Sequence, residues 1–257
     1  MLAYLIILVV VLVYMTGWFL IALLKRRNDL ADMAWGIGFI VAASAALAVK
    51  GTGTPRAWLV YILVMIWGVR LAVHIGTRLR KHPEDQRYRQ WREDWGAHWR
   101  SRSFVRIFML QGGLCYLISL PVICIILADQ SAWTWFDRLG IIVWVVGFLF
   151  EVVGDYQLKS FVQNEANRGK IMQEGLWKYT RHPNYFGEVA LWWGIYLIAL
   201  ATPGGWITII GPVTISFLIL KVSGIPLLEK EFMNNPEFQE YARRTSAFFP
   251  LPPTKDG

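Results

Sequence analysis

The long apolar runs of the chain are the feature that most constrains its fold. The first reads "LAYLIILVVVLVYMTGWFLIALL" over 2–24, and a helix that spans a bilayer needs about 20 such residues. This run has no basic start and no small-residue cleavage site, and it is too long for a signal-peptide core, so we interpret it as a retained span. Charged residues make up only 17% of the chain, against about 25% in soluble proteins. The sequence therefore predicts an all-α integral membrane protein.

The distribution of Lys and Arg predicts how the helices cross the membrane. The loops after the first, third and fifth apolar segments, together with the tail after the seventh, hold 22 of the 26 Lys and Arg residues. This alternation fits the positive-inside rule and predicts an N-terminus outside and a C-terminus in the cytoplasm. We expect a single membrane domain over 1–257, present as a monomer. The seven predicted spans lie near 2–24, 33–49, 57–79, 104–128, 138–158, 186–201 and 205–222.

The net charge of +8 follows from this topology and from contact with anionic membrane lipids. The cations lie at helix ends rather than on one folded basic face, so nucleic acid is not an expected partner.

Ionisable residues within the predicted spans form a second pattern. Such side chains are costly in a bilayer and are functional candidates by default. Two sets of three recur at four-residue spacing, which places each set near one helical face and favours a polar cavity open to the cytoplasm. Salt bridges within the bundle and snorkelling at helix ends are the structural alternatives. The residues concerned are Asp32, Arg70, His74, Arg78, Glu151, Asp155, Lys159 and Glu188.

The segment "KYTRHPNYFGE" at 178–188 places polar groups at the entry to the apolar run "VALWWGIYLIALA". The connection 159–185 that leads to it mixes cations with amides, which suits a phosphorylated ligand such as a nucleotide. A solvated loop would explain the cations but not the compact "RHPNY". Pro183 biases His182 towards an extended conformation, so we expect a helix to restart near Asn184 with its N-terminus facing the cavity. The cations and amides are Lys159, Arg168, Lys170, Arg181, Gln163, Asn164, Asn167 and Asn184.

Other motifs give little support to alternative chemistry. The sequence has no glycine-rich nucleotide loop and no CxxC, HExxH or GxSxG pattern. Its four His residues lack metal-ligand spacing, so we expect no metal site. Cys115 and Cys124, nine residues apart on one helix, point to different faces and are not expected to form a disulfide.

Three motifs together resemble the steroid 5-alpha-reductase family, most closely its bacterial members with a short N-terminus. These are "GDYQLKSF", "GLWKYTRHPNYFGEVALWWG" and "GIPLLEKE" with the later "EYARRTSAFFP". The resemblance covers about 138–250 and is more diffuse in the N-terminal half, through "DLADMAWGIGF" and "WGVRLAVHIGTRL". The central motif is specific for a superfamily rather than for one reaction, because sterol reductases and isoprenylcysteine methyltransferases carry a similar Arg-His-x-x-Tyr segment.

This resemblance implies a seven-span protein in the bacterial inner membrane that binds NADPH in a cytoplasm-facing pocket and reduces a membrane-soluble enone, such as a 3-oxo-4-ene steroid. Asp155, Lys170, Tyr179 and Asn184 fall on positions that look cofactor-binding in the family. Arg181, His182 and Glu188 belong to the shared motif. The full expected cofactor-binding set is Arg70, Asp155, Lys159, Arg168, Lys170, Tyr179, Arg181, His182, Asn184, Tyr185 and Glu188.

The residue that would polarise the substrate ketone departs from the family pattern. Animal members use a Gln-Glu pair and a Tyr, whereas this chain has "ADMAW" and Trp67 at the corresponding places. The candidate catalytic residues are Asp32, His74 and Glu188, and we favour Asp32 as the donor to the ketone. The alternative is that Asp32 only caps the second span, since Asp is a favoured N-cap residue.

Two other functions stay open at this point. An S-adenosylmethionine-dependent isoprenylcysteine or lipid methyltransferase is suggested by the acidic pair Glu229 and Glu231 in the tail, while Lys170 and "GDYQLK" favour a reductase. A transporter or structural protein is the third class, but the chain shows no inverted repeat.

Overall fold

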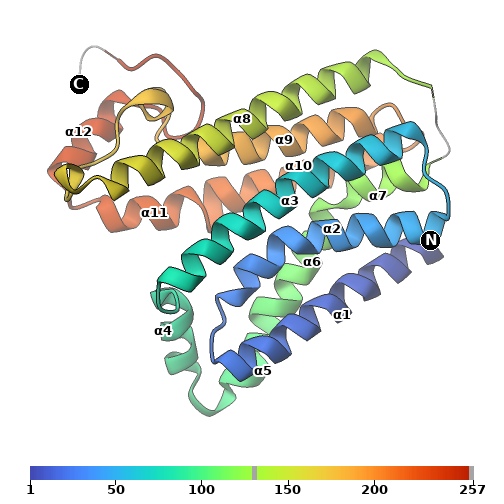
Figure 1. The fold of residues 1–257 in the computed structure, drawn as a ribbon, viewed down its shortest axis with the longest axis horizontal. Helices are drawn as coiled ribbons and strands as arrows, with labels where there is room; N and C mark the ends of the chain where they lie inside the picture. The colour runs from blue at the N-terminus through green and yellow to red at the C-terminus, as the bar shows by residue number, and fades with distance from the viewer. Residues whose placement is uncertain (129–131, 255–257) are drawn as a thin grey trace. The chain divides into compact units, whose positions relative to one another are not determined.

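The structure is a computed structural model that describes residues 1–128 and 132–254, apart from the side chain of Glu231. The described residues form helices and connecting segments with no β-strand, which confirms the all-α class (Figure 1). The chain divides into two compact units. Unit 1 comprises Met1–Trp133 and Ala199–Gly211, and unit 2 comprises Thr134–Ile198 and Pro212–Gly257. The single membrane domain expected from the sequence stays a prediction.

Unit 1 is built on three long helices, α1, α2 and α3. The backbones of α2 and α3 approach each other closely at Gly36 and Gly68. A Cβ on Gly36 would lie only 2.9 Å from the carbonyl oxygen of Gly68. In lipid, apolar burial does not drive helices together, so they associate through close packing, which small residues permit. Shorter helices complete the unit. The bounds are α1 Leu2–Lys25, α2 Leu30–Lys50, α3 Pro55–Lys81, α4 Gln86–Trp95, η1 Gly96–His98, α5 Trp99–Ser103, η2 Phe104–Met109, α6 Leu110–Ile118, α7 Leu120–Leu127 and η5 Gly205–Ile209.

The predicted span 104–128 is not one straight helix. It starts with a π-helical turn, η2, and it bends by 50° at Ser119, between α6 and α7. Pro121 lies in the first turn of α7 and has no backbone N–H to continue the helical ladder, which is a known cause of kinks. The Ser119 hydroxyl and its backbone N–H both donate to the Cys115 carbonyl, at 2.8 and 2.9 Å, and such bonding by a Ser side chain to the preceding turn often bends a helix.

Unit 2 is organised by a glycine seam between α8 and α9, which lie side by side in Figure 1. Gly147 of α8 packs directly on the α9 backbone, since a Cβ there would lie 2.5 Å from the Leu191 nitrogen. The seam glycines recur every seven residues and are Gly140, Gly147 and Gly154 on α8 with Gly187 and Gly194 on α9. The helices that lie wholly or mostly in this unit are α8 Trp135–Gln163, η3 Glu165–Asn167, η4 Gly175–Lys178, α9 Pro183–Ala199, α10 Ile210–Phe217, η6 Leu218–Val222, α11 Ile225–Phe232 and α12 Pro236–Arg244.

Four helical segments of the described chain are long and apolar enough to span a membrane: Leu2–Lys25, Leu30–Lys50, Pro55–Lys81 and Gly205–Lys230. The bent pair Gln86–Ile118 and Leu120–Leu127 makes five if it counts as one span. The protein is therefore an integral membrane protein. Helices also cover the two remaining predicted spans, as α8 and α9, but neither is among these candidates, and α9 has only 17 residues. Seven spans, an outside N-terminus and a cytoplasmic C-terminus stay predictions.

Candidate functional site

The residues expected to bind the cofactor fall in both units. Arg70 lies partly buried on α3 in unit 1, and the candidate catalytic residue His74 is exposed one turn further along the same helix. The others lie in unit 2, on α8, on α9 and on the connection between them. These are Asp155, Lys159, Arg168, Lys170, Tyr179, Arg181, His182, Asn184, Tyr185 and Glu188.

Arg181 is engaged inside unit 2. Its Nε and Nη2 donate to the two carboxylate oxygens of Glu229 on α11, at 2.8 and 3.1 Å. Its Nη1 donates to the carbonyls of Ala242 and Thr245, at the end of α12, at 3.0 and 2.6 Å. The guanidinium thus neutralises a carboxylate and satisfies terminal helix carbonyls at once. This arrangement favours a structural role for Arg181 over a phosphate contact.

His182 is buried beside the same carboxylate. Its Nε2 lies 3.0 Å from Oε1 of Glu229, and its ring stacks on Tyr185 with the centroids 5.6 Å apart. Its Nδ1 is buried and has no hydrogen-bond partner in the described part of the chain. When Nε2–H donates to the carboxylate, Nδ1 is a free acceptor. A ligand hydroxyl or amide N–H could satisfy it.

Asp155 and Asn184 meet where α9 begins. The Asn184 amide Nδ2 donates to Oδ1 of Asp155 at 3.1 Å. Pro183 is the first residue of α9, so the helix restarts where the sequence predicted. Gly154 allows the start of α9 to lie this close to α8. A larger residue at this position would place its Cβ only 3.1 Å from the Asn184 nitrogen. A carboxylate paired with an amide at a helix N-terminus can bind a ligand through both donors and acceptors.

The cationic connection between α8 and α9 is held in a defined shape. Ile171 donates its N–H to Glu237 of α12 at 3.2 Å, and the Trp177 indole donates to the Gly154 carbonyl at 3.1 Å. Lys170 directly precedes the first anchor, and its side chain is exposed. Arg168 and Lys159 are exposed as well, as is Tyr179. The connection therefore presents cations to solvent from a segment that is anchored at Ile171 and Trp177.

Asp32 belongs to a separate polar cluster in unit 1. Its Oδ1 accepts from the Tyr88 hydroxyl at 2.6 Å and from Nε2 of Gln111 at 3.5 Å. Asp29 occupies the N-cap of α2, and Asp32 is the third residue of that helix. The interpretation of Asp32 as the helix cap is therefore wrong. Tyr88 was not among the predicted site residues, because 56 positions separate it from Asp32 and no local motif links them.

Glu229 is the other residue that the predicted cofactor site omits. It accepts from both Arg181 and His182, whose side chains are mostly buried. The sequence gives little indication that Glu229 contacts Arg181, because 48 residues separate the two positions.

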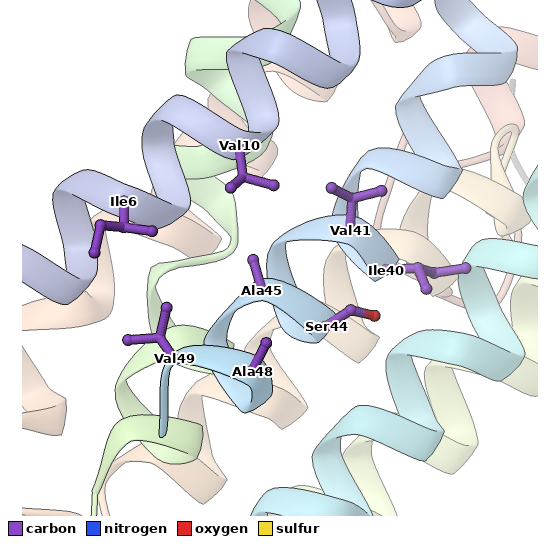
Figure 2. Close-up of a pocket in the computed structure, with 8 residues that line it drawn as sticks. All are labelled: Ile6, Val10, Ile40, Val41, Ser44, Ala45, Ala48 and Val49. Atoms are coloured by element: carbon purple, nitrogen blue, oxygen red, sulfur yellow. The ribbon is translucent and has the colours of Figure 1, made fainter. Parts of the chain in front are cut away.

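A cavity in unit 1 lies away from these polar groups and has no titratable lining residue. It measures about 540 Å³ and runs between α1 and α2. Figure 2 shows Ile6 and Val10 of α1 across the groove from α2. Its one polar lining residue, Ser44, has its hydroxyl 3.2 Å from that of Tyr61. The lining residues are Ile6, Val10, Ile40, Val41, Ser44, Ala45, Ala48 and Val49. An apolar groove on two membrane-length helices has the character of a lipid contact, not of a reaction centre.

Comparison with known proteins places this polytopic membrane protein in a family. The chain belongs to the family described as "Protein of unknown function (DUF1295)", which matches residues 18–245. Over 67 residues it is also 34% identical to 3-oxo-5-alpha-steroid 4-dehydrogenase 1 of Bos taurus, a stretch that covers 26% of each chain. The similarity thus spans about a quarter of the length of that curated relative. No solved structure matches the chain significantly.

Proposed function

We propose that the protein is an NADPH-dependent reductase of a membrane-soluble enone, with the 4,5 double bond of a 3-oxo-4-ene steroid as the substrate class. The observation that carries the proposal is the Asp155–Asn184 hydrogen bond at the start of α9, next to the fixed cationic connection. The partial similarity to a 3-oxo-5-alpha-steroid 4-dehydrogenase supports the same reaction class. Seven spans in a bacterial cell membrane, with the cationic connection in the cytoplasm, complete the proposal.

The polar groups of unit 2 fit such a cofactor in their chemistry. Lys170 and Arg168 are exposed cations that can pair with the 2′-phosphate that distinguishes NADPH from NADH. Asn184 and Asp155 offer an amide and a carboxylate for ribose or carboxamide groups. The unpartnered Nδ1 of His182 can accept from a hydroxyl. Bound NADPH would supply the hydride, while these residues would hold and orient it.

Reduction of an enone builds negative charge on the ketone oxygen, so a hydrogen-bond donor must face that oxygen. We assign this role to Asp32, as proposed from the sequence. Its cluster supports the assignment, because the Tyr88 hydroxyl and the Gln111 amide both donate to Oδ1 and so hold the carboxyl group in place, which leaves Oδ2 to carry the proton for the ketone. His74 is the alternative donor.

A methyltransferase of the same superfamily is the second candidate. The acid that suggested it, Glu229, lies close to the shared Arg-His motif, as a site for a cationic sulfonium ligand would require. Against it, Arg181 and His182 already occupy both carboxylate oxygens. The side chain of its companion, Glu231, lies outside the described part of the structure.

One experiment separates the two reactions. Purified protein in detergent is incubated with a 3-oxo-4-ene steroid and NADPH, and in parallel with S-adenosylmethionine and a prenylated cysteine. We expect oxidation of NADPH, formation of a steroid product that has gained two hydrogen atoms, and no methyl transfer. Retention of S-adenosylmethionine with no NADPH binding would contradict the reductase proposal.

A further inference from the structure

We propose that unit 1 carries a binding site for the phosphate of an anionic phospholipid, formed by Trp91, Trp95 and Arg106. These three residues line a cavity of about 280 Å³ between α4 and the π-helical turn η2. The site is separate from the proposed cofactor residues of unit 2, and it does not depend on the proposed reaction.

Arg106 provides the charge for such a ligand. Its side chain is exposed and makes no hydrogen bond or ion pair within 1–128 and 132–254. A free guanidinium at the rim of a cavity is suited to a phosphodiester, which it can bind through two parallel N–H donors. Arg106 also lies in a π-helical turn, a rare geometry that is frequent at functional sites.

The surrounding charges leave an excess of cations at this place. Arg87, Arg89 and Arg92 each pair with an acidic residue, namely Asp85, Glu93 and Glu84. The three later arginines of the stretch have no carboxylate partner among the described residues, and they are Arg100, Arg102 and Arg106. This unbalanced positive charge favours a net anionic headgroup over a zwitterionic one.

The two indoles give the cavity walls that suit the glycerol region of a lipid. The rings of Trp91 and Trp95 are stacked, with centroids 6.2 Å apart and an angle of 18° between the planes. Trp95 packs against the hydrophobic core of unit 1, which fixes its position, while Trp91 is 42% exposed. Trp is enriched at the level of the headgroups because its ring is amphipathic.

Exposed aliphatic side chains flank the cation and complete the match to a phospholipid. Val105 is 59% exposed and Leu110 is 55% exposed, on either side of Arg106 in the chain. A soluble phosphate ligand would gain nothing from these groups. A phospholipid would place its headgroup on Arg106 and its acyl chains along apolar surface.

The test measures lipid binding to the full-length protein in a neutral detergent by native mass spectrometry. We expect phosphatidylglycerol to bind about tenfold more tightly than phosphatidylcholine with the same acyl chains. Arg106→Gln should weaken phosphatidylglycerol binding about five- to tenfold, the usual effect of one lost charged contact at a membrane surface. Because the described residues form no hydrogen bond or ion pair with the Arg106 side chain, this variant should fold normally.

Arg102→Gln is the matched control, since it removes the same charge from an exposed residue outside the cavity. It should weaken binding clearly less than Arg106→Gln does, because Arg102 does not line the cavity and makes no direct contact with a phosphate bound there. Trp91→Ala should weaken binding of the same lipid, whereas Trp58→Ala, at another exposed indole, should not. Equal losses in the two Arg variants, or equal losses in the two Trp variants, would overturn the site. So would inorganic phosphate that displaces phosphatidylglycerol at equal concentration, because the site would then bind free phosphate.

Discussion

Arg181 and Glu229 form a two-point ion pair, with Nε to Oε1 at 2.8 Å and Nη2 to Oε2 at 3.1 Å. The pair joins the residues just before α9 to α11, and the same guanidinium reaches the end of α12. The side chains are only 11% and 17% exposed. The Arg181 side chain therefore links the segment before α9 to α11 and α12, and its role in cofactor binding stays a prediction.

Removal of this pair should destabilise unit 2. Glu229→Gln leaves the mostly buried Arg181 and His182 without their anion, so we expect a loss of about 2–3 kcal/mol, at or below the range for buried pairs. The measurement is thermal unfolding in detergent. Glu240→Gln is the control, because its i,i+4 pair with Arg244 is well exposed and should be worth less than about 1 kcal/mol. Similar losses of stability in both variants would show that the Arg181–Glu229 pair does not stabilise unit 2.

The glycine seam gives a prediction about helix packing. Gly147→Ala places a Cβ 2.5 Å from the backbone of Leu191, and backbone atoms cannot move aside, so α8 and α9 must separate. We expect a loss of about 3 kcal/mol or more, at the upper end for an overpacked core. In Gly17→Ala, on α1, the new methyl group meets nothing within 4 Å. That control should unfold at the same temperature as the parent or slightly higher, since Ala is the better helix former.

The fold was largely predictable because its signals are local. An apolar run of bilayer length such as 2–24 has one solution, a helix that satisfies its own backbone, and α1 follows that run almost residue for residue. The bend at Ser119 was not predicted, although Pro121 is visible in the sequence. A proline at the start of a helical segment can be tolerated in a straight helix or can kink it, and the neighbours that decide are distant in the chain.

The candidate site was less predictable, because several of its side-chain pairs join residues that are distant in the chain. The motif locates Asn184 and Asp155, and the structure brings them within hydrogen-bond distance. The same motif assigns Arg181 to a ligand, because its sequence neighbours do not reveal a partner 48 residues away. Tyr88 likewise meets Asp32 across 56 residues. Pairings of this kind depend on the tertiary fold, which periodicity and composition do not specify.

The predicted topology can be tested by labelling single cysteines. Thr52 and Gln90 are both exposed, and the native Cys115 and Cys124 are buried, so an introduced cysteine should be the main reactive thiol. The Lys and Arg distribution predicts that Thr52→Cys reacts from outside the membrane and Gln90→Cys from the cytoplasmic side. An impermeant maleimide applied to intact cells should label only the first. Labelling of both positions from one side would contradict the topology.

Lys170 should determine the preference for NADPH over NADH. Lys170→Ala removes an exposed ammonium that we assign to the 2′-phosphate, so NADPH binding should weaken about ten- to a hundredfold while NADH binding changes little. Lys178→Ala, at an exposed lysine of the same connection, is the matched control and should leave both affinities nearly unchanged. Equal losses for the two cofactors in Lys170→Ala would remove this residue from the phosphate site. Dissociation constants from cofactor fluorescence provide the measurement.

The assignment of Asp32 as the donor to the ketone rests on its ability to carry a proton. Asn in its place can still accept from the Tyr88 hydroxyl, so Asp32→Asn should fold normally. It is not an acid, however, so turnover of a 3-oxo-4-ene steroid should fall about a hundredfold while NADPH affinity is retained. Asp29 holds the N-cap position, so a capping role for Asp32 cannot account for such a loss.

Tyr88→Phe separates the two hydroxyl donors of this cluster. It removes the group that donates to Asp32 at 2.6 Å but leaves the carboxyl group itself in place. If Asp32 donates to the substrate and Tyr88 orients it, Tyr88→Phe should lower turnover less than Asp32→Asn does, again without a change in NADPH affinity. A larger loss in Tyr88→Phe would make the tyrosine hydroxyl the donor. Full activity in both variants would reject this cluster, and His74→Gln would then be the variant expected to lose turnover.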